Sequence, residues 1–421
     1  MSLFANRTFL KLFIASFASQ LGTIIGNMAF AFYLIDHFSS QPSYATLAEM
    51  MYTLPTLAVF FIVGVMADRF DRKRIAENSD WIRAGLTVIL FITISMNILP
   101  LVFFILFVRS AVSKFFQPAE TSMLQGILSP EQYTQASGLN QMIFGVFMLF
   151  GVGLGAIAYH LVGIKGAMIV DGISFVVSAL LIRNCKISED IRLPNGRTSW
   201  KDMKFSVITQ DFKAGLAYIL QHRLLLMIIS GFFIFGLING AFAVLPLFTM
   251  KYKLAPDTYE RFTSLFAIFL GIGFLAGSII GTAIAKLVKP YQIMITGLFF
   301  TAGLTVALSS MDNVWLYLAL ILVTGLFLAP VNIAIGGWLP ALVEPSYMGR
   351  VSAWIDPLMM LAHSIALGLI ALFYPHVVGL STIYYGIALA IFVVCLIYLF
   401  TLPKLSRENS EKVDSQVHSM N

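Results

Sequence analysis

Residues 64–74 read Gly-Val-Met-Ala-Asp-Arg-Phe-Asp-Arg-Lys-Arg, a charge-dense run in a chain where only 11% of residues are charged. Long apolar segments lie on both sides of this run. Charged residues between two segments that can each cross a membrane predict a short loop in water. Arg and Lys in short loops are retained on the cytoplasmic side, and four of them occur here. We therefore expect residues 64–74 to join two membrane spans in the cytoplasm.

The composition of the whole chain also indicates a membrane protein. Hydrophobic residues make up 58% of its 421 residues, whereas a soluble domain has about 45–50%. Continuous apolar runs recur that are long enough for a helix to cross a hydrocarbon core of about 30 Å, and such runs are typical of helices rather than of barrel strands. We expect twelve helical spans, at residues 9–35, 45–67, 81–99, 101–121, 137–162, 166–184, 224–248, 263–285, 291–311, 314–338, 352–374 and 382–402.

The basic residues predict the topology of the chain. The net charge of +6 is compatible with a nucleic-acid-binding protein, but the distribution of the charge is not. With the amino terminus inside, 22 of the 27 Lys and Arg residues fall in cytoplasmic segments or at cytoplasmic helix ends. We therefore expect both termini in the cytoplasm, a multi-pass location in the cell membrane and no nucleic-acid partner.

The chain divides near its middle, where residues 185–212 form the longest polar stretch and six expected spans lie on either side. Apolar residues at positions 212, 216, 219 and 220 mark one face of a helix that follows. We expect four parts: a six-helix bundle at residues 1–184, a cytoplasmic linker with an amphipathic surface helix at 185–223, a second six-helix bundle at 224–403 and a polar cytoplasmic tail without regular structure at 404–421.

An internal repeat relates the two halves. Residues 281–289 repeat the loop that begins at Gly64 and keep its basic positions, with alanine in place of Asp68. Residues 343–352 repeat residues 128–137 at nearly the same offset. The repeat predicts two pseudo-symmetric six-helix bundles.

The pattern Gly-x-x-x-Asp-Arg-x-x-Arg-Lys at residues 64–73 resembles the loop between helices 2 and 3 of the major facilitator superfamily of transporters. Within that superfamily, the chain resembles the macrolide-efflux-like group of drug–proton antiporters at residues 107–110, 117–119, 128–131, 136–141, 170–175, 211–223 and 348–351. The resemblance implies the major facilitator fold, with substrate bound midway between the two bundles.

The loop is expected to act as a gating motif, formed by Gly64, Asp68, Arg69, Arg72 and Lys73. Asp68 follows Gly64 by one helical turn, at the end of the second expected span. We expect its carboxylate to accept hydrogen bonds from a basic side chain or a helix amino terminus in the other half. Such a contact would close the cytoplasmic side and favour the outward-facing state.

Polar residues inside the expected spans are candidates for the substrate cavity. Arg109 lies near the middle of the fourth span, where arginine costs about 2.5–3.5 kcal/mol to insert. The resemblance places it in a motif implicated in proton and substrate handling, and the alternative is a structural arginine bonded to its neighbours. The first span carries a polar face made of Ser16, Gln20, Thr23 and Asn27. The set expected to line the cavity, with helix–helix hydrogen bonding as the alternative, is Gln20, Asn27, Arg109, Asn239 and Asn332.

Titratable residues in the spans are candidates for coupling transport to protons. Glu49 lies in the second span near its outer boundary, where the alternative is a side chain solvated at the interface. Asp36 lies near the outer end of the first span, where the first interpretation is an outer-gate or capping residue and a proton carrier is the other. Asp356 and His363 are seven residues apart in the eleventh span, so they lie near one face of a helix and could relay a proton; the alternative is that Asp356 caps the cytoplasmic end of its helix. Asp171, in the sixth span, is expected to make a structural bond to a neighbouring helix.

These patterns predict a secondary transporter that exchanges protons for lipophilic or amphipathic small molecules, such as drugs or macrolides, by alternating access. The 37 Phe and 19 Met residues suit an adaptable apolar cavity. Other carriers of the same fold stay open, namely a lysophospholipid flippase, a siderophore exporter or a solute uptake carrier.

An enzyme is not expected. The sequence has no His-Glu-x-x-His, no Gly-x-Ser-x-Gly and no Gly-x-x-x-x-Gly-Lys-Ser/Thr motif. We therefore expect no catalytic residues, no cofactor and no metal site. The expected partners are the small-molecule substrate, protons and the lipid bilayer, and the chain is expected to be a monomer.

Overall fold

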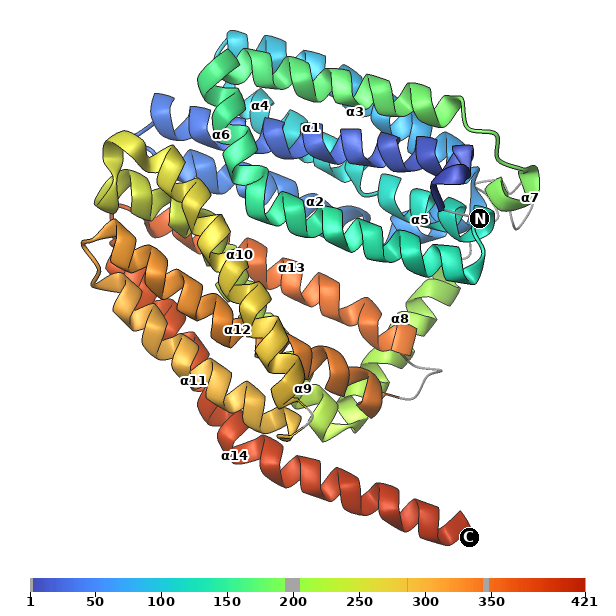
Figure 1. Ribbon diagram of the computed structural model, residues 1–421, viewed down its shortest axis with the longest axis vertical. Coiled ribbons are helices and arrows are strands. Elements are labelled where there is room, and N and C mark those ends of the chain that lie inside the picture. The colour runs from blue at the N-terminus through green and yellow to red at the C-terminus, as the bar shows by residue number, and fades with distance from the viewer. Residues whose placement is uncertain (1–2, 194–204, 286, 344–347, 421) are drawn as a thin grey trace. The chain divides into compact units, whose positions relative to one another are not determined.

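The computed structural model describes residues 3–193, 205–285, 287–343 and 348–420, and their regular structure is helical (Figure 1). The chain divides into two compact units between residues 204 and 205. This division falls inside the stretch that the sequence predicts to be a linker.

The amino-terminal unit begins with a short 3-10 helix at Leu3–Ala5. Its α-helices are α1 (Arg7–His37), α2 (Ser43–Arg69), α3 (Arg72–Ser95), α4 (Leu99–Ser113), α5 (Phe116–Ile127), α6 (Pro130–Arg183) and α7 (Glu189–Arg192). Within this unit, α6 packs against α1 and α3, and α4 packs against α2 and α3. These contacts bring side chains of α1, α3, α4 and α6 into one core.

The carboxyl-terminal unit holds α8 (Phe205–Gln221), α9 (Arg223–Thr249), α10 (Tyr259–Ile284), α11 (Pro290–Ser309), α12 (Val314–Leu342), α13 (Met348–Phe373) and α14 (Leu380–Met420), with a π-helical turn at Met250–Leu254 and a 3-10 turn at Pro256–Thr258. The amphipathic helix expected in the linker is α8. It packs on α13, where the ring of Phe212 stacks on that of Trp354 with 3.8 Å between the ring centroids. The Trp354 indole also donates a hydrogen bond to the Phe212 carbonyl at 2.9 Å.

Among the described residues, nine helical segments are long and apolar enough to cross a membrane. They include α1, α9 and each of the long helices from α10 to α14. The helix α3 is not one of them, because six charged residues lie in its first half, namely Arg72, Lys73, Arg74, Glu77, Asp80 and Arg83. The expected count of twelve spans stays a prediction.

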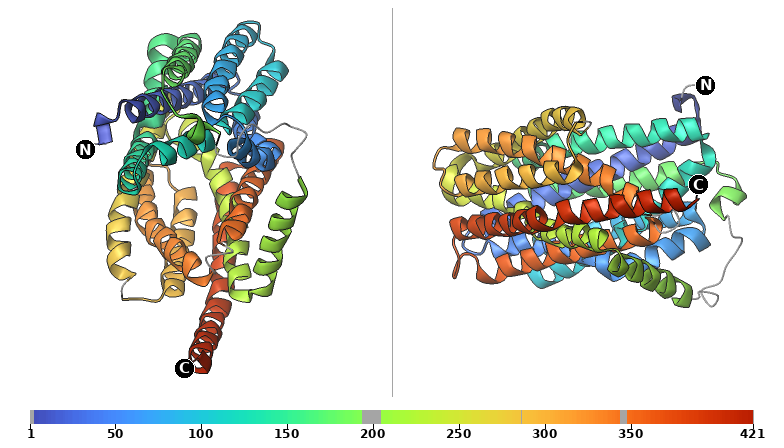
Figure 2. Two further views of the ribbon diagram at one scale, coloured as in Figure 1. Left: turned by 90° about the vertical axis from the view of Figure 1, so that its right-hand side faces the viewer. Right: turned by 90° about the horizontal axis from the view of Figure 1, so that it is seen from below.

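The element α6 is two helices that meet at a kink at Gly163 (φ 62°, ψ −176°), a backbone conformation that favours glycine, and this kink lies between the fifth and sixth expected spans (Figure 1). Two boundaries differ from those expected from the sequence. The fourth expected span is interrupted between Ser113 and Phe116, where α4 ends and α5 begins. The prediction that residues 404–421 have no regular structure is wrong, because α14 continues as a helix to Met420 (Figure 2). Extending an existing helix needs no new nucleation.

Two glycines allow the second part of α6 to lie against α1. A Cβ atom on Gly22 would clash with the Ser174 hydroxyl and lie 2.6 Å from Ser174 Cβ. A Cβ atom on Gly26 would lie 3.0 Å from Asp171 Oδ2. This close approach places Asp171 beside the polar face of α1.

We expect Gly22→Ala to destabilise the amino-terminal unit, because overpacking at a tight helix contact costs about 1–3 kcal/mol. The matched control is Gly85→Ala in α3, where an added Cβ meets nothing within 4 Å. Thermal melting of the purified proteins in detergent should show a lower melting temperature for Gly22→Ala alone. Equal melting temperatures for the two variants would contradict this packing.

Candidate functional site

A buried ion pair joins α4 to α6 in the amino-terminal unit. Arg109 Nη1 lies 2.6 Å from Asp171 Oδ2, and the exposed fractions of the two residues are 4% and 0%. Arg109 also donates hydrogen bonds to Asn27 Oδ1 in α1 and to Thr87 Oγ1 in α3, each at 3.4 Å. The guanidinium group therefore contacts side chains from three other helices.

A second buried ion pair lies within α3, between two residues that are one helical turn apart. Arg83 Nη1 is 3.0 Å from Asp80 Oδ1, and both residues are buried. The pair also binds the polar face of α1, since Arg83 donates to Ser19 Oγ at 2.9 Å and to Thr23 Oγ1 at 2.6 Å. Ser19 in turn donates to Asp80 Oδ1 at 3.2 Å.

Phe175 on α6 contacts the arginines of both ion pairs. Its ring centroid lies 3.9 Å from the Arg83 guanidinium carbon and 5.4 Å from that of Arg109, distances at which a cation is attracted to an aromatic ring. We call the two ion pairs and Phe175 the polar network; it comprises Asp80, Arg83, Arg109, Asp171 and Phe175. Its two positive and two negative groups balance, which limits the cost of burying them.

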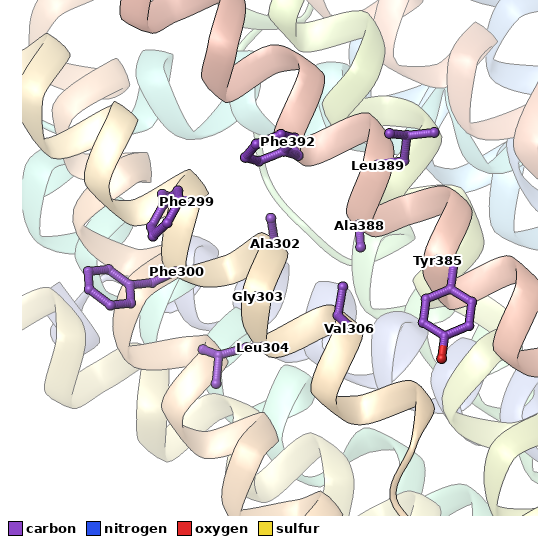
Figure 3. Close-up of a pocket in the computed structure, with 10 residues that line it drawn as sticks. All are labelled: Phe299, Phe300, Ala302, Gly303, Leu304, Val306, Tyr385, Ala388, Leu389 and Phe392. Carbon is purple, nitrogen blue, oxygen red and sulfur yellow. The ribbon is translucent and has the colours of Figure 1, made fainter.

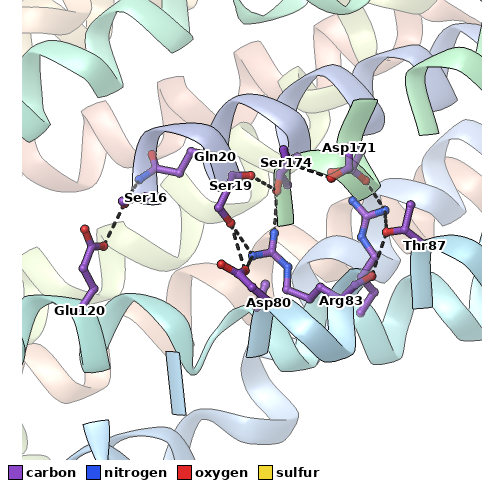
Figure 4. A network of polar contacts seen from close by, with 12 residues as sticks. Ser16, Ser19, Gln20, Asp80, Arg83, Thr87, Glu120, Asp171 and Ser174 are labelled. Carbon is purple, nitrogen blue, oxygen red and sulfur yellow. Dashed lines mark hydrogen bonds and ion pairs between the residues drawn. The ribbon is translucent and has the colours of Figure 1, made fainter. Parts of the chain in front are cut away.

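A third acidic group contacts the same face of α1. Ser16 donates to Glu120 Oε2 on α5 at 3.0 Å, and Gln20 donates to Ser16 Oγ at 2.9 Å. Figure 4 shows Glu120, Ser16 and Gln20 at one end of the contacts and Asp171 at the other. The polar face predicted for the first span is therefore lined along its length by side chains of α3, α4 and α5.

The structure places the expected cavity residues in different surroundings. Asn27 contacts Arg109, and Gln20 is exposed beside Ser16. Asn239 on α9 and Asn332 on α12 are exposed in the other unit, where Asn332 donates to the Leu328 carbonyl at 3.1 Å. The structure thus brings two of the five expected residues into one contact, Asn27 with Arg109.

The proton-coupling candidates lie apart from this ion pair. Glu49 is half-buried on α2, and Asp36, near the end of α1, accepts a hydrogen bond from Tyr159 at 3.2 Å. Asp356 is exposed and His363 is half-buried, both on α13. Within the described residues, the carboxylate paired with Arg109 is that of Asp171, for which sequence reasoning expected a bond to a neighbouring helix.

Sequence reasoning also missed Asp80 and Arg83 as site residues. The third span expected from hydropathy begins at residue 81, which would place Arg83 at a cytoplasmic helix end. The helix begins at Arg72 instead, so Arg83 lies in its middle and is buried. The spacing of Asp80 and Arg83, one helical turn apart, is the signal that could have indicated the pair.

The gating motif is described in part. Gly64, Asp68 and Arg69 lie in α2, and the surroundings of these three residues are outside what the structure describes. Arg72 donates to the Ile191 carbonyl at 3.3 Å, and Lys73 donates to the carbonyls of Arg183 and Cys185 at 2.7 and 2.8 Å. Arg72 and Lys73 thus bind the backbone of residues 183–192, which run from the end of α6 through α7.

Asp71 connects the same loop to α7. Its carboxylate caps the amino terminus of α3 by accepting from the backbone N–H groups of Lys73 and Arg74, and it forms an ion pair with Arg192. The Arg192 Nε atom donates to Asp71 Oδ1 at 3.1 Å. Burial raises the pKa of Asp71, but hydrogen bonds and charge from Arg192 and Arg74 outweigh burial, so the pKa is lowered overall.

A carboxyl group with a lowered pKa stabilises the fold above its ordinary pKa of about 3.9, and this contribution is lost as the pH falls through the lowered value. We expect Asp71→Asn and Arg192→Gln each to lower the free energy of unfolding at neutral pH by about 1 kcal/mol or less, because the pair is partly exposed, and so to lower the melting temperature. The double variant should melt no lower than either single variant. The Asp71→Asn difference should disappear in acid.

The control is Arg183→Gln, because its backbone carbonyl, and not its exposed side chain, contacts Lys73. Additive effects of Asp71→Asn and Arg192→Gln in thermal melting would show that the two residues do not interact.

No group of three or more His, Cys, Asp or Glu side chains is placed to hold a metal ion among the residues that the structure describes.

A family model described as Major Facilitator Superfamily matches residues 12–354. The uncharacterized MFS-type transporter YkuC of Bacillus subtilis (strain 168) is 55% identical over 412 residues, which cover 98% of this chain and 96% of that protein. Macrolide efflux protein A of Streptococcus pyogenes is 26% identical over 372 residues, which cover 84% of this chain and 86% of that protein.

Solved structures share the fold. A mutant of the peptide transporter POT in complex with alafosfalin is 13% identical, with a TM-score of 0.72 and 94% of each chain covered. A bacterial homologue of the iron transporter ferroportin in an inward-facing state is 14% identical, with a TM-score of 0.73, and 95% of this chain and 99% of that chain are covered.

Proposed function

Because the chain belongs to the Major Facilitator Superfamily and is a multi-pass membrane transporter rather than an enzyme, we propose that it exports lipophilic or amphipathic small molecules in exchange for protons. The resemblance to macrolide efflux protein A over most of both chains supports the direction and the substrate class. We further propose a monomer in the cell membrane, with both termini in the cytoplasm.

Twelve spans in two six-helix bundles form part of this proposal. Within the described residues, nine segments qualify by length and hydropathy; the one in α6, Leu149–Arg183, crosses the kink at Gly163 and is counted here for the part after it. Three further helical segments are long enough to cross a hydrocarbon core: α2 with 27 residues, α3 with 24 residues and the part of α6 before Gly163. Adding these three to the nine gives twelve.

One observation carries the proposal of proton coupling, namely the Arg109–Asp171 ion pair. Ionised side chains inside membrane spans are costly, so they indicate a functional site. Here the pair connects α4 to α6 and contacts α1 and α3 through Asn27 and Thr87. A change in its charge would therefore act on four helices at once.

The proposed cycle follows from this charge balance. While Asp171 is ionised, it holds Arg109 and the four helices keep one arrangement. When Asp171 binds a proton, Arg109 is left as an uncompensated buried cation, which favours rearrangement toward a state where water or substrate contacts it. One proton moving inward across 100 mV supplies about 2.3 kcal/mol for export.

The other titratable residues that the sequence indicates stay proposed as proton-coupling residues. They are Glu49, Asp36, Asp356 and His363. The gating motif around Asp68 would close the cytoplasmic side in the same cycle. Both roles remain proposals that follow from the sequence.

We expect Arg109→Ala to abolish pH-driven uphill export, measured as flux in proteoliposomes with an imposed pH gradient and a panel of dyes, macrolides and lysolipids. Arg109→Lys should recover part of the flux, because it keeps the charge but loses the planar donor fork. Arg183→Gln, on the exposed surface of the same unit, is the matched control and should transport normally.

Loss of folding must be separated from loss of coupling, since leaving Asp171 unpaired costs about 3–5 kcal/mol. The double variant Arg109→Gln/Asp171→Asn removes both charges, and it should be monodisperse while lacking pH-driven export. If Arg109→Ala still concentrates substrate and an uncoupler still collapses that export, the arginine is structural. Transport of lysolipids alone would favour a flippase, and inward accumulation would favour an uptake carrier.

A further inference from the structure

A hollow of about 550 Å³ lies between α11 and α14 in the carboxyl-terminal unit. Its walls include Phe299, Phe300 and Val306 from α11, and Tyr385 and Phe392 from α14 (Figure 3). Figure 3 shows Phe299 and Phe392 at one end of the hollow and Val306 and Tyr385 at the other. Apart from the Tyr385 hydroxyl, the side chains on these walls are apolar.

Small residues create the space. Gly303 lies on the α11 wall, and a Cβ atom added there would meet nothing within 4 Å. Ala302 and Ala388 also line the hollow. Large apolar side chains around these positions are exposed, among them Phe299 at 55% and Leu389 at 63%. Where α11 and α14 cross the membrane, a hollow between their exposed side chains is open to lipid.

One end of the hollow is polar, and an ion pair lies near it. The Tyr385 hydroxyl lies beside the hydroxyls of Ser309 and Ser310, where α11 ends. Lys253 Nζ donates to the Ser309 carbonyl at 2.9 Å and forms an ion pair with Asp312 at 3.3 Å. The hollow therefore begins near the end of a span, at the level where lipid headgroups lie, on the side predicted to be outside the cytoplasm.

The length of the hollow fits the hydrocarbon part of one leaflet. From Phe299 to Val306, α11 rises about 10 Å at 1.5 Å per residue. One leaflet contributes half of a core of about 30 Å. A chain that enters at Tyr385 would thus reach Phe299 while it remains within its own leaflet.

We propose that this hollow binds one acyl chain of a membrane phospholipid, whose phosphate lies at the Lys253 end. An apolar groove with one polar end matches the two parts of a phospholipid in the same order, and at that end Lys253 would exchange its ion pair with the exposed Asp312 for the phosphate. The hydrophobic effect does not act between apolar groups inside a bilayer, because water is absent there. Close packing of the acyl chain against Phe300, Gly303 and Phe392 therefore favours its binding over its release into bulk lipid. The site does not depend on which molecule the protein transports.

The test uses the full chain in nanodiscs of phosphatidylethanolamine and phosphatidylglycerol, with a trace of phosphatidylglycerol that carries a photoactivatable diazirine in its acyl chain. After illumination, peptide mass spectrometry maps the labelled residues. We expect the label to concentrate on residues 299–306 and 385–392. Gly303→Trp should fill the hollow and lower this labelling about tenfold, the change expected from about 1.4 kcal/mol.

The matched control is Gly386→Trp on α14, where an added Cβ also meets nothing within 4 Å but the residue does not line the hollow. Its labelling should stay close to that of the wild type. Gly303→Leu serves as a second variant if the Trp variant is not monodisperse. Lys253→Gln should reduce labelling by phosphatidylglycerol more than labelling by a phosphatidylcholine probe.

Three results would overturn the proposal. One is labelling spread evenly over all the spans, which would mean bulk lipid only. Another is labelling of residues 299–306 that Gly303→Trp and Gly303→Leu leave unchanged. The third is a cross-link between two copies of the chain through α11 or α14, which would mean that a second copy covers the hollow.

Discussion

Arg109 and Asp171 are both charged and both almost completely buried, and this constraint shapes the amino-terminal unit. Removing two ions from water costs several kcal/mol each, so each needs the other and further hydrogen bonds. Asn27 and Thr87 provide those contacts from α1 and α3. The packing of four helices is therefore tied to the charge of one carboxyl group.

Residues next to the ion pair strengthen the dependence of helix packing on the charge of Asp171. Gly26 lets α1 approach Asp171, and Phe175 contacts the guanidinium groups of both Arg83 and Arg109. The Asp80–Arg83 pair holds α3 to α1 through Ser19 and Thr23, so it fixes one side of the network independently of Asp171. A proton on Asp171 would release one pair and leave the other intact, which suits a switch between two packed arrangements.

The helices could largely be predicted from the sequence, because long apolar runs and charged loops are local signals. The polar face of α1 could be found for the same reason, since its residues recur at helical spacing. The partner of Arg109 could not, because the contact with Asp171 is made between helices that are distant in the chain. Asp80 and Arg83 were hidden by the start of α3, which begins nine residues before the span expected from hydropathy. The hollow beside Gly303 depends on small residues from two helices, and neither helix alone predicts it.

The central claim is that Asp171 changes its protonation state while Arg109 does not. Infrared difference spectroscopy of the reconstituted protein, recorded while the pH is lowered from alkaline to acidic, detects the carbonyl stretch of newly protonated carboxyl groups. The account predicts a band that is absent in Asp171→Asn and present in Asp257→Asn, where an exposed carboxyl group is replaced. An unchanged spectrum in Asp171→Asn would contradict it, because the ion pair would then be a fixed structural contact.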